Sequence, residues 1–342
     1  MRTRVLLPTL TAAVLAFPFA GPAASALSRA AEPQNAGLGI RLLDAPVDRR
    51  NDPRAHSYIV DHLSPGTTIT RRVQVSDNTR GPLHVALYVG GAAVDNGTFL
   101  PAARGAPSEL TQWSSVVPSS VAMQAGKTAI ATVTISVPRD ASSGERYGVI
   151  WAELPPSKGT AVREVNRVGV RIYLSVGSGG EPRSDFTVDS LQATRRADRV
   201  AVVVAQIHNT GGRALDMSGT LSLSRGPAGL SAGPFPATLG TTLAAGQTEP
   251  VTVPLAKAIT GGPWYAELEV RSGVLTRKAA AWLTFPDRPG SAGPAVRATG
   301  VPLYQDRNTV QLFAAGLIGL LLLLLLILAL KEWLRRQRRV QD

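Results

Sequence analysis

The sequence predicts an all-β protein with two tandem Ig-like β-sandwiches followed by a single C-terminal transmembrane helix. Three observations lead to this fold class. Short segments alternate apolar and polar residues with period two, which is typical of strands that bury one face. Glycine, proline and asparagine separate these segments, as expected for turns between strands. A long uncharged apolar stretch, 310–330, stands near the C-terminus.

The N-terminus is typical of a secretory signal peptide, which we expect to occupy residues 1–26. Arg2 and Arg4 give it a positive start, an apolar stretch follows over 5–20, and the small residues of 24–26 fit a cleavage site. The chain has 342 residues and no cysteine. The absence of cysteine excludes disulfides, thiolate metal sites and a cysteine nucleophile.

The first sandwich is predicted over residues 37–178. Period-two alternation is clearest in three segments, at 83–89, 131–137 and 168–176. Turn residues lie between the strand-like segments, at 77–82, 125–127 and 142–144. The alternation indicates antiparallel strands with one face in a core and the other in solvent.

The second sandwich is predicted over residues 182–285, after the Gly/Pro/Ser-rich break "GSGGEPRSD". Its sequence repeats the plan of the first. "VQVSDNTRGPLHVAL" (73–87) parallels "AQIHNTGGRALDMSG" (205–219), and "AGKTAIATVTISVP" (125–138) parallels "AGQTEPVTVPL" (245–255). Strands at these intervals with turn signals between them are typical of Ig-like sandwiches.

The C-terminal part is predicted to hold the chain at a membrane. Residues 286–309 lack periodicity and are rich in proline and glycine, which favours a stalk. The stretch 310–330 is long enough to span a bilayer as a helix. A basic cytoplasmic tail, 331–342, follows and sets the orientation through Lys331, Arg335, Arg336, Arg338 and Arg339. The bulk of the chain is then extracytoplasmic, as in a single-pass type I protein.

No group of residues in the sequence fits a catalytic or metal site, so the chain is predicted not to be an enzyme and to need no cofactor. Glu145 and Glu153 in "SGERYGVIWAEL" would lie about 26 Å apart on one strand, too far to act on one bond. His56 and His62 would likewise be too far apart on a strand to share a metal ion.

The irregular segment 90–120 supplies the candidate ligand-binding residues. A loop of this length often serves recognition. Phe99, Glu109 and Trp113 could stack on a sugar and hydrogen-bond to it. The alternative is that Phe99 and Trp113 close the end of the core.

The formal net charge of the chain is +12. A basic surface outside the cell favours anionic neighbours such as wall polymers or lipid headgroups. Nucleic acid is not an expected partner, because the basic residues are scattered along the chain. General solubility of the protein is the alternative explanation of the charge.

Two quoted segments and the order of parts resemble the WxL-interacting proteins of Gram-positive bacteria. The segments are "YIVDHLSPGTTITRRVQVSDNT" (58–79) and "SELTQWSSVVPSSVAMQAGKTAIATVTISVPRDASSGERYGVIWAEL" (108–154). The resemblance implies an Ig-like peptidoglycan-binding domain, a second Ig-like domain that binds a host or partner protein, and a membrane helix with a basic tail. The alanine-, arginine- and glycine-rich composition suggests an actinobacterial source.

Together these observations predict a membrane-anchored cell-surface protein that binds peptidoglycan or a surface protein partner without catalysis. Its expected partners are the membrane, cell-wall glycan or anionic wall polymers, or another surface protein. A structural or accessory subunit of a membrane complex is the second hypothesis, and a wall-active enzyme is the third.

Overall fold

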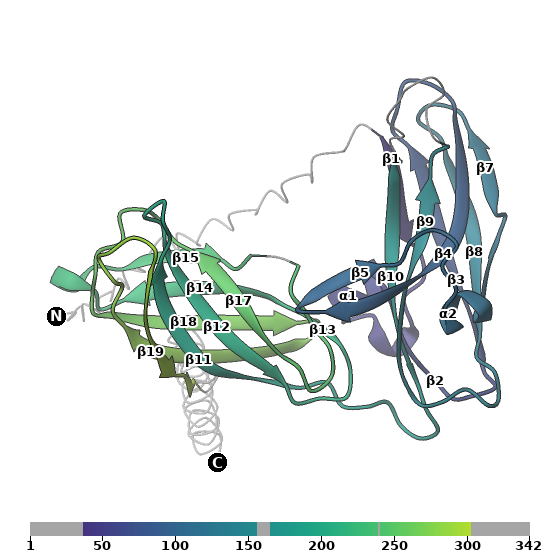
Figure 1. Cartoon of the computed structure of the whole chain (residues 1–342). Helices are drawn as coiled ribbons and strands as arrows, with labels where there is room; N and C mark the ends of the chain where they lie inside the picture. Colours follow the sequence, from purple (N-terminus) through teal and green to yellow (C-terminus); the bar gives the residue numbers. More distant parts are fainter. Residues whose placement is uncertain (1–36, 156–164, 239, 302–342) are drawn as a thin grey trace, which may run out of the picture.

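The structure is a computed structural model that describes residues 37–155, 165–238 and 240–301. The described chain is all-β, with Ig-like β-sandwiches and only short helical turns (Figure 1). These turns are η1 (Val47–Arg49), α1 (Pro53–Ser57), α2 (Glu109–Trp113) and η2 (Pro227–Gly229). The strands of the second sandwich run roughly across those of the first (Figure 1).

The first sandwich consists of two facing sheets. One sheet has the order β1 (Leu38–Leu42), β3 (Thr68–Asp77), β8 (Thr128–Ser136), β6 (Ser114–Val117). The other has the order β2 (Ile59–Leu63), β10 (Arg167–Val176), β9 (Gly144–Glu153), β4 (Leu83–Asp95), β5 (Thr98–Pro101), with β7 (Ser120–Met123) also paired to β4. All pairs are antiparallel except β2 with β10, which is parallel.

The core of the first sandwich follows from the alternation in its strands. On β10 the even-numbered residues Val170, Ile172 and Leu174 are buried between the two sheets, and β9 adds Ile150 and Ala152. Burial of such side chains is the main stabilising contribution to a sandwich of this kind. The odd-numbered residues of both strands therefore lie on the outer face of their sheet.

The second sandwich has its own core. One sheet has the order β17 (Thr248–Pro254), β12 (Ala201–Asn209), β11 (Phe186–Arg195), β20 (Ser291–Arg297). The facing sheet has the order β15 (Ala232–Pro236), β14 (Ser218–Ser224), β18 (Trp264–Ser272), β19 (Leu275–Leu283), β21 (Thr299–Gly300), and a short pair joins β13 (Leu215–Asp216) to β16 (Thr242–Leu243). Leu191, Val203, Leu268 and Phe285 are among its fully buried residues.

Each sandwich contains a turn of the same kind, in the segments that the sequence repeat relates to each other. Asp77 and Asn209, both 0% exposed, end β3 and β12, and each accepts a hydrogen bond from the backbone N–H two residues later. Each also exchanges backbone hydrogen bonds with an Ala-Gly turn, around Gly126 in the first sandwich and Gly246 in the second. Both glycines have a positive φ, 72° and 74°, which glycine adopts without strain.

The structure differs from the sequence prediction in two segments. Residues 90–120 are not one irregular loop, because a two-residue turn at Asn96 and Gly97, both with positive φ, closes a hairpin between β4 and β5. The Asn-Gly dipeptide is the sequence signal for such a turn. The segment predicted as a stalk contains β20 and β21, and β20 pairs with β11. Its proline and glycine content concealed these short edge strands.

Among the residues that the structure describes, no helix is long and apolar enough to cross a membrane. The predicted signal peptide (1–26), the predicted span (310–330) and the predicted basic tail (331–342) lie outside the described residues, and so do Lys331, Arg335, Arg336, Arg338 and Arg339.

The shared turn can be tested at Asn209. Its amide group donates to the carbonyl oxygens of Arg213, Leu243 and Ala244 at 2.7–3.1 Å. We expect Asn209→Ala to lower the free energy of unfolding by about 2–4 kcal/mol, because buried carbonyl groups lose their donor. The exposed Asn78→Ala, in the matching turn, should change it by less than about 0.5 kcal/mol. Urea denaturation of both variants measures the difference, and equal effects would contradict this account of the turn.

Candidate binding surfaces at the domain junction and a sheet edge

The β4–β5 hairpin of the first sandwich contacts the second sandwich directly. Thr98 forms a β-bridge with Thr241, and the backbone N–H of Thr242 donates to the carbonyl oxygen of Gly97 at 2.8 Å. Phe99 of the same hairpin packs with Tyr147, Tyr173 and Ala214 in a small apolar cluster on the outer face of the β9–β10 sheet. The second sandwich thus covers the part of this face that carries Phe99, Tyr147 and Tyr173.

A buried arginine links the two sandwiches at the junction. The side chain of Arg213 is 3% exposed. It pairs with Glu181 from the segment between the sandwiches and, at 3.7 Å, with Glu145 of β9, and it donates to the carbonyl oxygen of Asp61 at 3.1 Å. Burial, together with the nearby guanidinium of Arg49, lowers the pKa of Arg213 to about 10. Arg213 therefore remains a cation at neutral pH, and its burial is costly unless these carboxylate and carbonyl partners stay in place.

A second group of polar contacts stands at the carboxylate of Asp216. Oδ1 accepts hydrogen bonds from the hydroxyls of Tyr173 (2.7 Å) and Thr242 (2.8 Å), and Arg54 of α1 pairs with Oδ2 at 3.1 Å. Arg54 also donates to the carbonyl oxygen of Ala214. Burial, then the charge of Asp216, raises the pKa of Tyr173 above its usual value, so the phenol stays a neutral donor.

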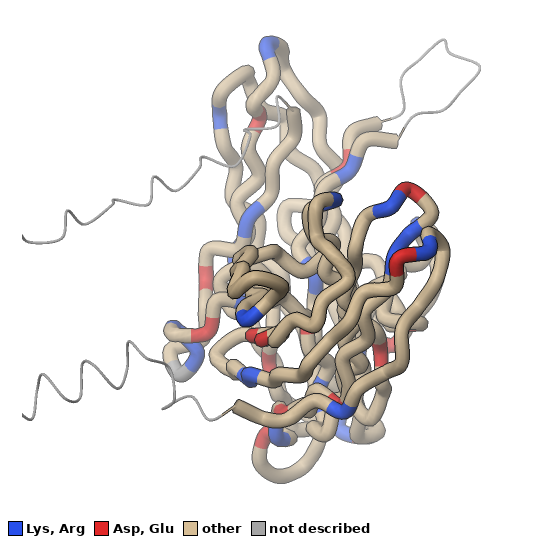
Figure 2. Tube along the Cα trace, turned by 90° about the vertical axis from the view of Figure 1, so that its left-hand side faces the viewer, with Lys and Arg blue, Asp and Glu red and all other residues tan. Residues whose placement is uncertain are grey.

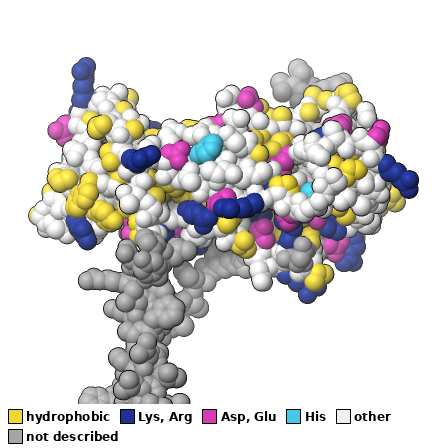
Figure 3. Space-filling view, turned by 90° about the horizontal axis from the view of Figure 1, so that it is seen from below, with side chains coloured by type: hydrophobic (Ala, Val, Ile, Leu, Met, Phe, Trp, Pro, Cys, Tyr) yellow, Lys and Arg dark blue, Asp and Glu magenta, His cyan; other side chains and the backbone are white. Residues whose placement is uncertain are grey.

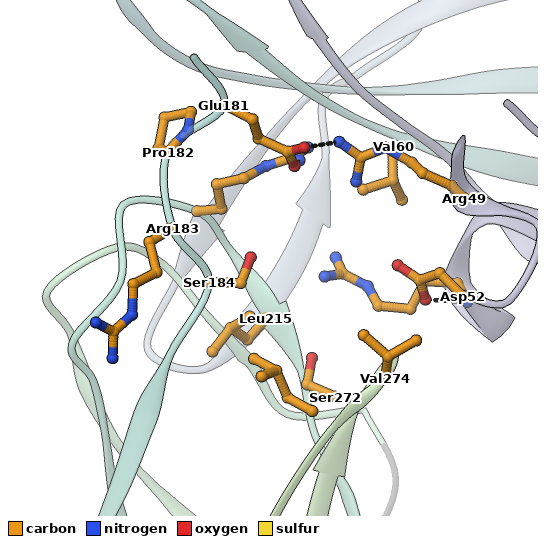
Figure 4. A pocket seen from close by; sticks show the side chains of 13 residues that line it. Arg49, Asp52, Val60, Glu181, Pro182, Arg183, Ser184, Leu215, Ser272 and Val274 are labelled. Carbon is orange, nitrogen blue, oxygen red and sulfur yellow. Dashed lines mark hydrogen bonds and ion pairs between the residues drawn. The ribbon is translucent and has the colours of Figure 1, made fainter. Parts of the chain in front are cut away.

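A cleft of about 350 Å³ opens between the sandwiches beside these contacts (Figure 4). Arg49 of the first sandwich, Glu181 and Ser184 of the segment between the sandwiches, and Ser272 of the second sandwich line it from different sides (Figure 4). Ser272 is 4% exposed, and its hydroxyl has no hydrogen-bond partner among the described residues. The cleft is polar, and its acidic and basic groups are largely paired with each other.

The second surface is a half-strand without a partner, at residues 167–171 of β10. On one side β10 pairs with β9 along its whole length, whereas on the other side β2 pairs only with 172–176. In the parallel register, residues 54–58 would continue β2 alongside 167–171, but this segment forms most of α1 instead. Arg54 holds α1 against the second sandwich through Ala214 and Asp216.

The antiparallel ladder identifies which backbone groups face this open edge. Leu154 N–H donates to the carbonyl oxygen of Asn166, so even-numbered residues of β10 bond to β9. Gly177 N–H bonds to Leu63 on the opposite side, which agrees with that alternation. The N–H and C=O groups of Arg167, Gly169 and Arg171 therefore point away from β9. In the parallel register, the N–H of Ile59, the first residue of β2, faces the C=O of Arg171. Beyond that point β2 does not reach, which leaves the N–H groups of Arg167, Gly169 and Arg171 and the C=O groups of Arg167 and Gly169 without a strand partner among the described residues.

Aromatic rings and arginines cover the outer face beside the open edge. Trp151 lies close to Gly90 of β4 and Gly169 of β10, where a Cβ atom at either glycine would come within about 3 Å of the ring. The guanidinium of Arg167 lies 4.2 Å from the centre of the Trp151 ring, and that of Arg171 lies 4.6 Å from the centre of Phe99. Aromatic rings and guanidinium groups thus lie next to each other on this face.

The three predicted ligand-binding residues do not converge. Phe99 is 6% exposed and belongs to the cluster at the junction. Trp113 packs against the core of the first sandwich, which was the alternative reading of the sequence, and the guanidinium of Arg146 lies 5.7 Å from its ring. Glu109 is half exposed and forms an ion pair with Arg146 at 2.5 Å. Only Glu109 offers a largely accessible side chain.

The two carboxylates that the sequence analysis excluded as a catalytic pair have little exposed side-chain surface. Glu145 is 9% exposed in its side chain and accepts a hydrogen bond from the backbone N–H of Ala214 at 2.6 Å. Glu153 is 3% exposed and accepts hydrogen bonds from Tyr88 and Arg104. Alternation could have placed both on the face of Tyr147 and Trp151, but it could not show that other parts of the chain cover that face.

The remaining candidates of the sequence have ordinary structural contacts. His56 contacts the carbonyl oxygen of Arg50 at 2.7 Å, and His62 contacts the Ser175 hydroxyl at 3.2 Å. Within the described ranges, no three His, Asp or Glu side chains gather as metal ligands would. Basic and acidic residues are interspersed over both sandwiches, and no face in view carries charges of one sign only (Figures 2 and 3).

Comparisons with known proteins give a likeness of fold. No family model matches the chain, and no curated protein matches its sequence. Among solved structures, a Pseudomonas aeruginosa CupB2 chaperone is 12% identical, covers 66% of this chain and 98% of its own, and has a TM-score of 0.36. The E. coli chaperone DraB is 10% identical, with 71% and 94% covered and a TM-score of 0.36. The class 5 fimbriae chaperone CfaA is 11% identical, with 78% and 100% covered and a TM-score of 0.31.

The three solved structures are chaperones by name, and at 10–12% identity they are similar to this chain in fold only. The likeness concerns the β-sandwich architecture alone. The predicted membership of the WxL-interacting family is wrong by the same comparison, because no family model matches and the similar solved structures are fimbrial chaperones. The quoted motifs were strand and turn signals, which many β-sandwiches share.

The comparison also contradicts the predicted function, partners and location. A membrane-anchored, Gram-positive binder of peptidoglycan was inferred from that resemblance and from a predicted span. The neighbours are chaperones, and the described part of the chain contains no membrane-spanning helix. A membrane partner and cell-wall polymers are therefore not part of the function proposed below.

The junction can be tested at Arg213. We expect Arg213→Ala to lower the free energy of unfolding by about 3–5 kcal/mol, because Glu145, whose side chain is 9% exposed, loses the cation that compensates its charge. Arg183→Ala is the matched control, since Arg183 lines the same cleft but is 80% exposed in its side chain. Its effect should stay below about 1 kcal/mol. Denaturant titration followed by fluorescence measures both, and a mild effect of Arg213→Ala would contradict the account of the junction.

The open edge predicts an alternating pattern of amide hydrogen exchange. The amides of Val168 and Val170 bond to β9 and should exchange at least about a hundredfold more slowly than those of Gly169 and Arg171. NMR-detected exchange of the deuterated chain measures this pattern. In 173–176, where β2 covers the other side, the amides of odd-numbered and even-numbered residues should both be protected from exchange. Uniform protection over 167–171 would show that the edge is not open.

Proposed function

We propose that this chain is a non-catalytic protein-binding protein that takes an extended segment of a partner polypeptide as an added strand at residues 167–171 of β10. The observation that carries the proposal is the set of unpaired backbone N–H groups of Arg167, Gly169 and Arg171, beside a half of the same strand that β2 completes. An unpaired edge offers a row of donors and acceptors to which an extended peptide can bond.

The residues around the edge support its use as a binding site for an added strand. Gly169 is exposed, so its backbone is accessible from solvent. On the core side, Val168 is only partly buried, and Ile40 of the nearby β1 is also partly buried. An added strand would place apolar side chains beside these two residues and so complete the open side of the sandwich.

The second sandwich has a positional role in this proposal. Its contacts with Arg54 hold residues 53–57 in α1 and keep them from pairing with 167–171. The charge network at Arg213 fixes the angle between the sandwiches. The partner segment would thus meet a preformed edge, which lowers the ordering cost of binding.

Strand addition can be tested with a pair of N-methylated peptides. The probe is the neutral peptide SQVTVQS, added to the full-length chain. For a peptide that adds antiparallel with its threonine opposite Gly169, methylation of the glutamine and threonine amides should abolish binding, because these N–H groups would bond to β10, whereas methylation of the valine amides should preserve it. The readout is protection of the Gly169 and Arg171 amides from hydrogen exchange.

Two results would count against the proposal. One is that no peptide protects these amides at millimolar concentration. The other is that both methylated forms bind equally, because binding would then not depend on backbone hydrogen bonds.

A further inference from the structure

We infer that the β10 edge selects a partner segment with two acidic residues four positions apart and apolar residues between them, in the pattern acidic–apolar–small–apolar–acidic. The inference rests on the proposed strand addition and specifies its partner. It follows from the side chains that alternate along 167–171 and from the charge that surrounds them.

The alternation of β10 sets the alternation of the partner. In a strand pair, residues directly opposite each other have side chains on the same face of the sheet. The outer face presents Arg167, Gly169 and Arg171, whereas Val168 and Val170 face the core. A strand paired with this edge would place every second side chain beside the arginines and the others beside the valines.

The described residues balance the charge of the two arginines only in part. Arg167 stacks on Trp151 and lies opposite Glu153 in the β9–β10 register, but the ion pair of Glu153 is with Arg104. Arg171 lies 3.6 Å from Asp216, but this single carboxylate also pairs with Arg54. Carboxylates on the partner strand, one beside each arginine, would neutralise this excess of positive charge.

The middle of the edge restricts the partner in another way. A Cβ atom built at Gly169 would lie 2.3 Å from Val149 and 2.9 Å from the Trp151 ring. The side chains of β9 therefore fill the outer face over Gly169. A partner side chain opposite this glycine lies next to the tryptophan ring, and we expect it to be small.

The same charges argue against a second copy of this chain as the occupant. If two such edges paired antiparallel about Gly169, Arg167 of each copy would lie opposite Arg171 of the other. Like charges directly opposite each other destabilise a strand pair. The arginines thus protect the edge from self-association while they attract an acidic strand.

The inference can be tested with three peptides that differ only in charge: SEVTVES, SQVTVQS and SKVTVKS. We expect the glutamate peptide to bind the full-length chain roughly fivefold more tightly than the glutamine peptide, and the lysine peptide to bind more weakly than both. Added salt should reduce the advantage of the glutamate peptide. Fluorescence anisotropy gives the affinities, and amide exchange at Gly169 confirms the site.

Protein variants test the role of the arginine. Arg167→Gln should remove about half of the glutamate preference in free-energy terms, roughly a twofold change. Arg167→Glu should shift the preference toward the lysine peptide. Arg196→Gln is the control, because Arg196 is exposed and pairs with Asp198 in the second sandwich. Unchanged protection of Val168 and Val170 verifies that each variant keeps its β9–β10 pairing.

The outcomes separate this inference from the proposed function. If all three peptides protect Gly169 with equal affinity, strand addition stands and the acidic preference is wrong. If none protects it, the proposed function fails and the inference fails with it. A glutamate preference that Arg167→Glu leaves unchanged would also overturn the inference, because the charge would then act elsewhere.

Discussion

The rest of the structure depends on the buried guanidinium of Arg213. It joins β9 through Glu145, the segment between the sandwiches through Glu181, and the middle of β2 through the Asp61 carbonyl. A cation buried to this degree costs several kcal/mol unless its partners remain in place. Rotation of one sandwich against the other would separate these groups. The charge network therefore fixes the angle at which the sandwiches meet.

The junction also explains why one sheet edge stays open. The second sandwich covers the lower outer face of the β9–β10 sheet and holds α1 through Arg54. Residues 54–58, which could extend β2 alongside β10, are thereby used for a different contact. One set of side chains thus gives the protein its fixed shape and leaves a half-strand free. Arg167 and Arg171 at this half-strand would repel a second copy and attract an acidic segment.

Much of the fold could be predicted from local sequence. Alternation at 168–176 correctly indicated which residues of β10 face the core. The parallel between 73–87 and 205–219 anticipated the matching turns at Asp77 and Asn209. Less could be predicted for the site. The sequence left open whether Phe99 contacts a ligand or closes the end of the core, and it gave no sign that the hairpin carrying Phe99 lies against the second sandwich. The resemblance to a wall-binding family was misleading, because strand and turn signals are shared by unrelated sandwiches.

The sequence by itself determined the all-β class, the faces of the strands and the turns, because these depend on neighbours within a few residues of each other. Only the tertiary structure decided that Glu145 and Arg213 are buried together, that α1 replaces an extension of β2, and that β10 keeps an open edge. These features depend on contacts between residues that are far apart in the chain. Period-two alternation shows that a strand has two faces and two edges, but it does not show what covers them.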